Sequence, residues 1–330
     1  MRITKRQIRA GYKFISAKFL AKKVPLIVGW SITNRCNLHC LFCTRWKSQA
    51  RELDTGQVCA IIDALSQMGT YGINFTGGEP LIREDIGMLL RYSKKKGINT
   101  RVFSNGLLVP GRIDELEGVD CLTMSLSGIE EKAGDCWYGA SPSVIASAID
   151  AAKKKNVYVK LHTVLTKDNL DRLDSILHFA KEHGAMVDFS VIEFLPFSEE
   201  QNIKPLLPSQ KELKTALGLL ISEKKAKNAE IGNSLASLKY LKQWPDQIRL
   251  ECAAGKIFCR IEADGNVYPC AGLIRKVEPQ NCLGQGLRSA FMKMKPVICD
   301  SCWCSTHIEM NYAYALNLSV ILEIMKNYRL

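Results

Sequence analysis

Short apolar runs alternate with longer amphipathic segments along the first two thirds of the chain. Runs with the composition of buried strands, each ending in a polar or glycine-containing turn, lie at residues 24–33, 71–76, 98–104, 121–126, 157–165 and 187–194. Helix-like segments lie between them at 56–69, 83–96, 143–155 and 170–184. This alternation predicts a parallel sheet with right-handed crossovers. Because a closed TIM barrel needs about eight such units, we predict an α/β fold built on a partial (β/α)6 TIM-like barrel.

The segments outside the barrel have other patterns. Near the start, Ile8, Tyr12, Ile15 and Phe19 recur at helical spacing among basic residues, which predicts an amphipathic helix. From about residue 251 the chain is irregular and rich in cysteine, as expected of a small unit held together by metal. The predicted organisation is an N-terminal basic helix (1–23), the barrel (24–200), a helical bridge (201–250), a small cysteine-rich C-terminal domain (251–310) and a C-terminal helix (311–330).

The chain contains 13 cysteines, most of them in two groups. An odd number in a large, core-rich chain argues against a disulfide framework, and clustered cysteines in a reducing compartment more often bind metal. Cys59 and Cys121 stand apart on predicted apolar faces and are expected in the core. No run approaches the roughly 18 apolar residues of a membrane span, and no secretion signal is evident. We therefore expect a cytoplasmic protein.

The net charge of +12 is unevenly distributed. Residues 1–23 contain eight basic residues and no acidic one, so the rest of the chain carries only +4. This is not the basic body of a nucleic-acid-binding protein, and we expect no nucleic-acid partner. The N-terminal helix can either cover the open end of the barrel or lie on an anionic membrane surface, and its pattern fits both.

The strongest chemical signal is the segment Cys36-Asn-Leu-His-Cys40-Leu-Phe-Cys43, directly after the first predicted strand. In parallel α/β folds, active sites form at the carboxyl ends of strands. Three thiolates on one loop can bind three irons of a cubane cluster and leave the fourth iron open to a ligand. The alternatives are a structural zinc site that lacks one ligand, or three unrelated thiols. His39 is available as a fourth zinc ligand, but it would need strained geometry in so short a loop.

This segment resembles the C-x3-C-x-aromatic-C signature of the radical S-adenosylmethionine (SAM) superfamily, with an aromatic residue in the expected place. Later segments resemble that family's GGEP motif, its T-N-G motif and its SAM-binding serine, in order and after successive strands. The resemblance implies that a carboxylate in the GGEP segment accepts hydrogen bonds from the ammonium group of SAM. The residues implied to contact SAM are Phe42, Gly77, Gly78, Glu79, Pro80, Ser104, Asn105 and Ser125.

One segment departs from the family. Many relatives carry H-D-x-x-R-G after the fourth strand, whereas this chain reads Gly-Asp-Cys-Trp-Tyr-Gly at 134–139. The missing His and Arg indicate an unusual pocket. Trp137 and Tyr138 can either face the substrate or pack against their own domain.

The second cysteine group resembles the SPASM domain or its shortened form, twitch, which binds auxiliary iron–sulfur clusters. A turn at Asp264-Gly265-Asn266 predicts a hairpin that folds Cys252 toward Cys270. The resemblance favours one auxiliary [4Fe–4S] cluster, and a zinc ribbon is the alternative. The expected ligands are Cys252, Cys270, Cys299 and Cys302, with Cys259, Cys282 and Cys304 as substitutes or as ligands of a second cluster.

The resemblance implies an enzyme in which the cluster at Cys36, Cys40 and Cys43 reductively cleaves SAM to a 5′-deoxyadenosyl radical, which abstracts hydrogen from a substrate carbon. It favours a peptide substrate and a reductant such as flavodoxin or ferredoxin. The basic, aromatic N-terminal segment favours instead a lipid-linked or small-molecule substrate at a membrane surface. A non-enzymatic iron–sulfur or zinc-binding module is the alternative of another class.

Overall fold

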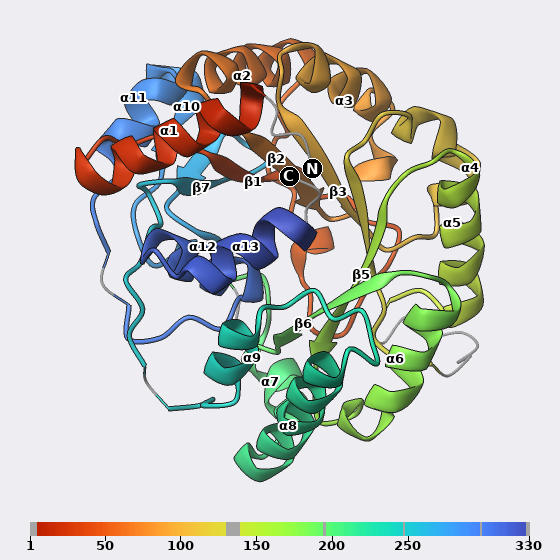
Figure 1. Ribbon diagram of the computed structural model, residues 1–330. Helices are drawn as coiled ribbons and strands as arrows, with labels where there is room; N and C mark the ends of the chain where they lie inside the picture. Colours follow the sequence, from red (N-terminus) through yellow and green to blue (C-terminus); the bar gives the residue numbers. More distant parts are fainter. Residues whose placement is uncertain (1–4, 130–138, 194–195, 247, 298, 328–330) are drawn as a thin grey trace.

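The computed structural model describes residues 5–129, 139–193, 196–246, 248–297 and 299–327, and its centre is one nine-stranded sheet. The strand order is β6-β5-β4-β3-β2-β1-β7-β8-β9 (Figure 1). The strands are β1 Ile27–Thr33, β2 Gly72–Gly77, β3 Asn99–Ser104, β4 Cys121–Ser125, β5 Val159–Leu165, β6 Met186–Val191, β7 Phe258–Ile261, β8 Asn266–Tyr268 and β9 Gln280–Asn281. Neighbours from β6 to β1 are all parallel, which confirms the predicted partial barrel.

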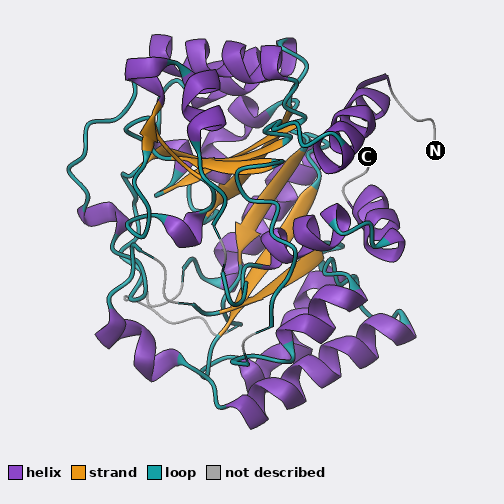
Figure 2. Ribbon diagram, turned by 90° about the vertical axis from the view of Figure 1, so that its left-hand side faces the viewer, coloured by secondary structure: helices purple, strands orange, loops and turns teal. Residues whose placement is uncertain are grey.

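Helices follow the strands and surround the sheet (Figures 1 and 2). The predicted helix at 56–69 is α2, which begins with a capping box between Asp54 and Gln57 and ends at Gly69 in the left-handed conformation. The helices are α1 Lys5–Phe19, α2 Thr55–Met68, α3 Ile86–Lys95, α4 Val109–Arg112, α5 Pro142–Lys154, α6 Leu173–Glu182, α7 Glu200–Ile203, α8 Gln210–Ala226, α9 Leu235–Leu241, α10 Cys282–Gln285, α11 Leu287–Lys293, α12 Ser305–Tyr314 and α13 Leu318–Asn327.

The apolar faces that the sequence pattern predicts make the main core. On α2, Val58, Ile61, Ile62 and Leu65 are buried against the sheet. This burial is the chief favourable term that holds the helices on the barrel, at about 25 cal/mol per Å² of apolar surface removed from water. Cys121 is buried in β4, where its thiol contacts the Thr123 hydroxyl at 3.7 Å, and Cys59 packs partly buried against the core.

The C-terminal region continues the barrel sheet. Strand β7 pairs in parallel with β1, so the edge of the predicted barrel is extended by residues 258–261. The predicted turn at 264–266 then reverses the chain, and β7 pairs antiparallel with β8. Gly265 has φ +84° there, a conformation that favours glycine. The backbone hydrogen bonds between β1 and β7 therefore join the barrel to the cysteine-rich region.

The prediction of a single C-terminal helix over residues 311–330 is wrong. Helix α12 ends at Tyr314, and α13 begins at Leu318. Between them Leu316 has φ +61°, which an α-helix cannot contain, and the Asn317 side chain accepts from the Val320 N–H at 3.2 Å to cap the second helix. The apolar periodicity runs through this break, so the pattern alone predicts one helix.

Helix α1 is present, but a different face from the predicted one packs against the protein. Phe14 and Ala17 join a small core with Val24, Phe258 and Tyr314. The predicted apolar stripe, which begins at Ile8, is exposed to solvent.

The interior of the barrel contains a buried ion pair. The ammonium of Lys160 on β5 lies 2.6 Å from a carboxylate oxygen of Asp188 on β6, and the Lys160 side chain is 2% exposed. Charges removed from water in this way are stable only as a pair. Both residues line a small cavity inside the barrel, together with Arg101 and His162.

We predict that Lys160→Met lowers the free energy of unfolding by roughly 3–5 kcal/mol, because it leaves the Asp188 carboxylate without its cation. Urea unfolding measures the change. Lys155→Met is the matched control, since the Lys155–Asp114 pair is exposed, and it should leave the midpoint unchanged. Equal effects of the two substitutions would contradict a special role for the buried pair.

Candidate active site

A cavity of about 230 Å³ opens at the carboxyl ends of the barrel strands. It is lined by the loops that follow β1, β2 and β3 and by side chains of β4 and β5. Loops from neighbouring parallel strands converge at this edge, where α/β proteins build their sites. The lining includes most of the residues expected to bind SAM or its cluster, namely Cys36, Cys40, Phe42, Cys43, Gly77, Gly78, Ser104, Asn105 and Ser125.

The first cysteine loop presents three half-buried thiols to this cavity. The backbone N–H of Cys43 donates to the carbonyl of Cys40 at 3.0 Å and turns the loop back on itself. Burial raises the pKa of the Cys36 thiol, and the nearby Glu79 carboxylate adds to the rise. A bound cation would reverse this effect, because metal ions favour the thiolate form. Three soft donors around one cavity are the donor set that an iron–sulfur cluster needs.

His39 does not complete a zinc site in this structure. Its ring stacks on the indole of Trp46, with centroids 4.0 Å apart. Throughout the part of the chain that the structure describes, no three His, Cys, Asp or Glu side chains are close enough to share one metal ion.

Two glycines bring the loop after β2 against the loop after β1. Gly77 has φ +137°, and a Cβ on it would collide with the carbonyl oxygen of Thr33. A Cβ on Gly78 would collide with the carbonyl of Arg35, next to the first cysteine. The N–H of Gly78 donates to Thr33 at 2.9 Å. Only glycine allows this backbone contact.

Glu79 differs from the expectation that its carboxylate faces SAM. The side chain is fully buried and does not line the cavity. One oxygen accepts from the Leu81 N–H at 3.1 Å and the Ser104 hydroxyl at 3.0 Å, and the other accepts from the Asn105 N–H at 2.8 Å. Burial raises the pKa of Glu79 to about 7. The carboxylate thus ties the loop after β2 to the loop after β3. Pro80 follows it and is also buried outside the cavity lining.

The loop after β3 is held by the same contacts. The Ser104 hydroxyl, besides donating to Glu79, accepts from the Gly106 N–H at 3.0 Å. The Asn105 amide donates to the side chain of Asn37, within the first cysteine loop, at 2.7 Å. Ser125 ends β4 with an exposed side chain at the cavity.

His162 is a cavity residue that the sequence analysis missed. It lies on β5, and its Nε2 is 3.0 Å from the Ser190 hydroxyl, which in turn contacts Ser305 at 2.7 Å. Burial lowers the pKa of His162, which favours the neutral imidazole. A signal was present in the sequence, because Lys160 and His162 are polar residues two positions apart in an otherwise apolar strand and so share one face.

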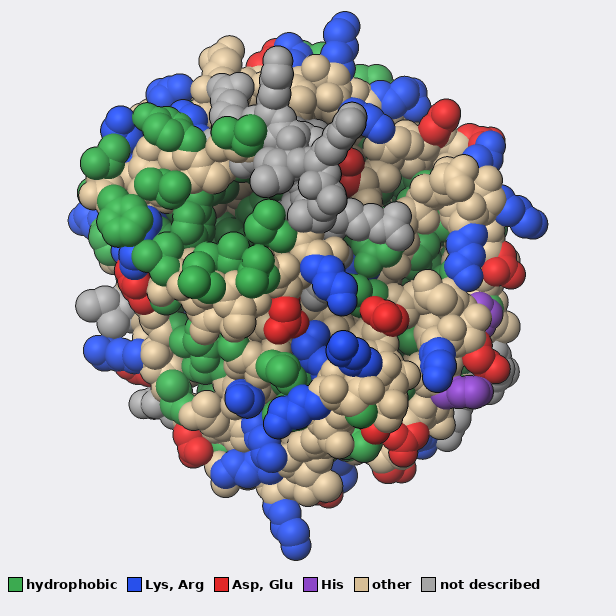
Figure 3. Space-filling view, in the orientation of Figure 1, with side chains coloured by type: hydrophobic (Ala, Val, Ile, Leu, Met, Phe, Trp, Pro, Cys, Tyr) green, Lys and Arg blue, Asp and Glu red, His purple; other side chains and the backbone are tan. Residues whose placement is uncertain are grey.

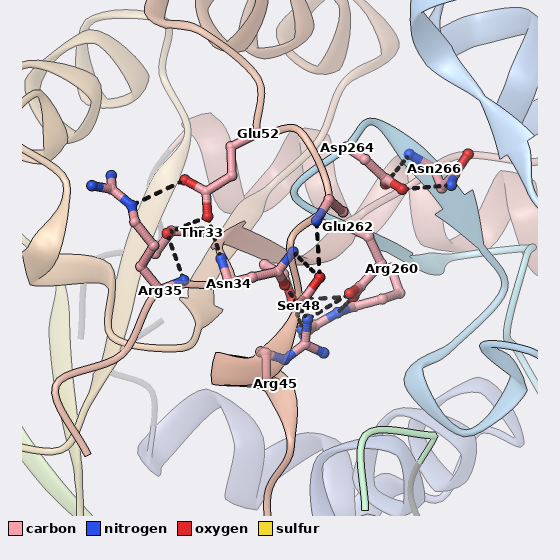
Figure 4. A network of polar contacts seen from close by, with 12 residues as sticks. Thr33, Asn34, Arg35, Arg45, Ser48, Glu52, Arg260, Glu262, Asp264 and Asn266 are labelled. Carbon is pink, nitrogen blue, oxygen red and sulfur yellow. Dashed lines mark hydrogen bonds and ion pairs between the residues drawn. The ribbon is translucent and has the colours of Figure 1, made fainter. Parts of the chain in front are cut away.

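A chain of buried charges joins the first cysteine loop to β7 (Figure 4). Arg45, two residues after Cys43, donates to one oxygen of Glu262 at 2.6 Å. Arg260 on β7 donates to the other oxygen at 2.8 Å. The two guanidinium groups keep the pKa of Glu262 low despite burial that acts to raise it. The chain links residues more than 200 positions apart, which the sequence pattern could not reveal.

Five thiols of the C-terminal region gather near the far end of this charge chain. Burial raises the pKa of Cys270 to about 12, and Cys252, Cys304 and Cys299 are close enough to add to the rise. Burial also raises the pKa of Cys302 well above its ordinary value, and Cys304, Glu193, Cys270 and Cys252 add to the rise. The structure therefore groups the four expected auxiliary ligands with one of the substitutes, Cys304.

Backbone amides point at several of these sulfurs. Cys252 accepts from the N–H of Ala254, and Cys270 accepts from that of Gly272. Cys304 lies at the N-cap of α12, where burial raises the pKa of its thiol and the backbone amides of His307 and Thr306 act to lower it. Such N–H donors favour thiolates, the form that binds metal.

Cys259 and Cys282 lie elsewhere. Both are buried in the main hydrophobic core, and the electrostatic environment of Cys259 includes Cys282 but none of the five grouped thiols. The structure thus separates these two substitute ligands from the rest. Trp137 and Tyr138, the two aromatic residues of the departing segment, lie outside the described residues.

Comparison with known sequences supports the family resemblance. The sequence model of the radical SAM superfamily matches residues 30–180, which include the first cysteine loop and the motifs after β2, β3 and β4. Residues 30–180 of the chain therefore form a radical SAM domain. The chain is an enzyme that uses SAM and a [4Fe–4S] cluster, not a non-enzymatic metal-binding module.

Curated relatives of this radical SAM enzyme align along most of its length. The AdoMet-dependent heme synthase of Methanosarcina barkeri is 26% identical over 276 residues, which cover 76% of this chain and 77% of the relative. The PqqA peptide cyclase of Ruegeria pomeroyi is 27% identical, with 74% and 67% covered. The mycofactocin maturase MftC of Mycobacterium ulcerans is also 27% identical, with 74% and 68% covered.

Solved structures share the fold. Streptococcus suis SuiB bound to S-adenosylmethionine superposes with a TM-score of 0.67 at 18% identity, over 88% of this chain and 72% of that one. The protein anSMEcpe with bound AdoMet and a peptide gives 0.61 at 16% identity, over 91% and 99%. These likenesses confirm the TIM-like α/β architecture of the radical SAM chain.

A larger groove lies beside the radical SAM cavity. Its volume is about 1100 Å³, and it shares Ser127 and Gly139 with the cavity lining. The loop after β5 and helix α8 form its other walls. The groove carries both signs of charge, from Lys167, Asp168, Asp171, Arg172, Lys211 and Glu212.

We predict that Glu79→Gln lowers thermal stability and SAM affinity together. The glutamine amide has one accepting oxygen, whereas the carboxylate of Glu79 accepts hydrogen bonds at two. Loss of a buried, charge-assisted hydrogen bond costs about 1–3 kcal/mol. Thermal unfolding and calorimetric titration with SAM measure the two effects, and Glu117→Gln on the exposed surface is the control. A loss of SAM affinity at unchanged stability would instead indicate direct contact between Glu79 and SAM.

Proposed function

We propose that this radical SAM enzyme modifies a carbon atom of a peptide substrate, with Cys36, Cys40 and Cys43 as the ligands of the SAM-binding cluster. The observation that carries the proposal is the meeting of these three thiols with the Gly77–Gly78 backbone in one cavity. Cys36, Cys40 and Cys43 would hold a [4Fe–4S] cluster with one open iron, and this group would supply the electron for cleavage of SAM to methionine and a 5′-deoxyadenosyl radical, which would abstract the substrate hydrogen. The protein supplies orientation and exclusion of water.

The cavity residues have separate roles in this proposal. The backbone of Gly77 and Gly78 receives the methionine end of SAM, because these two residues have no side chain and expose their main chain to the cavity. Ser104 and Asn105 shape the adjoining wall, and the Ser125 hydroxyl faces the SAM carboxylate. Phe42 packs beside Ile192 and Ile203 and keeps the loop against the barrel. Glu79 acts as a positioning residue, and Pro80 stiffens the turn that contains it.

A peptide substrate is supported by two observations. The names of two aligned relatives, a PqqA peptide cyclase and a mycofactocin maturase, indicate enzymes of peptide maturation. The groove beside the cavity is large enough for an extended segment, and its mixed charges offer partners for polar side chains and main-chain groups. We propose that the peptide lies in this groove with its reacting carbon near Ser127 and His162.

We propose one auxiliary [4Fe–4S] cluster at Cys252, Cys270, Cys299 and either Cys302 or Cys304. The five grouped thiols and the amides that point at three of them support the assignment. A flavodoxin or ferredoxin is the proposed electron donor, since the positive net charge suits an acidic carrier.

A lipid-linked or small-molecule substrate is the second candidate. The alignment with an AdoMet-dependent heme synthase and the exposed apolar side chains of α1 favour it. Mass spectrometry after incubation with candidate precursor peptides, SAM and reductant distinguishes the two. A peptide whose mass changes only in the presence of SAM supports the first candidate, and a modified lipid extract with unchanged peptides supports the second.

We predict that replacing Cys36, Cys40 and Cys43 together by alanine abolishes formation of 5′-deoxyadenosine, because no iron remains open to SAM. About four irons should remain, as one fully ligated cubane holds. Anaerobic reconstitution, iron and sulfide analysis and chromatography of the SAM products measure this. Cys59→Ala is the control and should behave as the native enzyme. Continued SAM cleavage by the triple variant would refute the ligand assignment.

We also predict that, on the background of that triple variant, Cys252→Ala removes the remaining iron, whereas Cys259→Ser combined with Cys282→Ser keeps it. Comparing Cys302→Ala with Cys304→Ala then identifies the fourth ligand, because only the substitution of a cluster ligand should remove the cluster. About eight irons in the triple variant would mean two auxiliary clusters. One zinc and no iron would mean a zinc ribbon.

A further inference from the structure

Helix α1 has two apolar faces, and only one of them serves the fold. On the inner face, the ring of Phe14 packs edge-on against Tyr314 of α12, with centroids 6.2 Å apart. The Tyr314 hydroxyl donates to the carbonyl of Ala17, which is buried. These contacts anchor α1 beside β7 and α12 through residues that the stripe pattern did not include.

The outer face carries a second apolar stripe that is mostly exposed to solvent. Ile8, Tyr12, Ile15 and Phe19 recur at intervals of three or four residues and are 63%, 64%, 55% and 65% exposed. Leu20, just after the helix, is 61% exposed. Scattered exposed apolar residues are ordinary, but an aligned row of large ones indicates an interaction surface.

Helix α13 extends this surface. Leu318 and Leu322 are one helical turn apart and are 73% and 66% exposed, whereas Val320 faces inward and is fully buried. Helix α12 contacts both α1 and α13, and the two outer helices lie on the same side of the molecule in Figures 1 and 2. Figure 3 shows hydrophobic side chains gathered over this region. We call the exposed residues Ile8, Tyr12, Ile15, Phe19, Leu318 and Leu322 the α1–α13 face.

Positive charge is concentrated in the sequence segment that contains the N-terminal half of the face. Residues 1–23 contain eight basic residues and no acidic one. Some of these cations serve the fold: Lys18 pairs with Glu251 at 2.6 Å, and Lys23 donates to the carbonyls at the C-terminal end of α11, those of Met292 and Met294. Lys22 is exposed beside Phe19 and Leu20. The surface therefore combines aromatic and aliphatic side chains with an excess of cations.

We propose that the α1–α13 face docks on an anionic lipid surface, with α1 lying in the plane of the interface. Apolar side chains would enter the acyl boundary while the lysines and arginines meet the headgroup charges. A second copy of the chain fits less well, because a twofold interface would bring two such cationic segments together. The part of the chain that the structure describes contains no helix with the length and hydrophobicity of a membrane span. The proposal is independent of the substrate.

Sedimentation of the full-length protein with vesicles tests this proposal. Vesicles of phosphatidylcholine with about one third phosphatidylglycerol should bind the protein, and pure phosphatidylcholine vesicles should bind it much less. Binding should weaken as salt is raised, since headgroup attraction is screened. Ile15→Ser combined with Phe19→Ser should weaken binding roughly ten-fold or more, and Leu318→Ser combined with Leu322→Ser should also weaken it.

Leu107→Ser is the matched control, because this exposed leucine lies outside the face, and it should bind vesicles as the native protein does. Circular dichroism and thermal unfolding should be unchanged in the face variants, whose altered side chains are exposed. Absence of binding to anionic vesicles, or equal binding to neutral ones, would overturn the proposal. Self-association that the face variants abolish, without vesicle binding, would assign the face to a second copy.

Discussion

The close backbone contact between the loops after β1 and β2 is the constraint on which the site depends. Gly77 and Gly78 lie against the carbonyls of Thr33 and Arg35, at the point where the first cysteine loop begins. Any side chain at either glycine would push the two loops apart. The contact fixes the position of the first thiol relative to the wall that faces it, so the cavity exists only because this pair of residues has no Cβ.

Glu79 fixes the next loop, the one after β3, in the same way. Its buried carboxylate accepts hydrogen bonds from the loop after β3, so the loops after β1, β2 and β3 form one connected wall. Such a carboxylate must be satisfied by protein donors, because it is removed from water. A motif that the family resemblance assigns to ligand binding thus also holds the scaffold of the site together.

Two structural features connect this wall to the C-terminal cysteines. Strand β7 pairs with β1 through the backbone, and Glu262 binds both Arg45 and Arg260 through side chains. The second feature places two cations and one anion between the first cysteine loop and the five grouped thiols. The reduction potential of an iron–sulfur cluster depends on nearby charge and on hydrogen bonds to its sulfurs. The two cysteine groups are therefore joined through the β1–β7 pairing and through the Arg45–Glu262–Arg260 contacts, so the C-terminal region is firmly attached to the barrel.

Sequence patterns alone predict the six parallel strands, the helices between them and the cysteine, glycine and serine positions of the cavity. These follow from local periodicity and from motifs at strand ends, which topology brings to one edge. Tertiary structure alone decided the buried role of Glu79, the pairing of β7 with β1, the Arg45–Glu262–Arg260 chain and the separation of Cys259 and Cys282 from the other thiols. It also decided which face of α1 is inside. The periodic apolar stripe of this helix is exposed, and the helix packs on the protein through Phe14 and Ala17 instead. Apolar periodicity identifies an amphipathic helix, but it does not tell whether the apolar face packs on the core or forms an interaction surface.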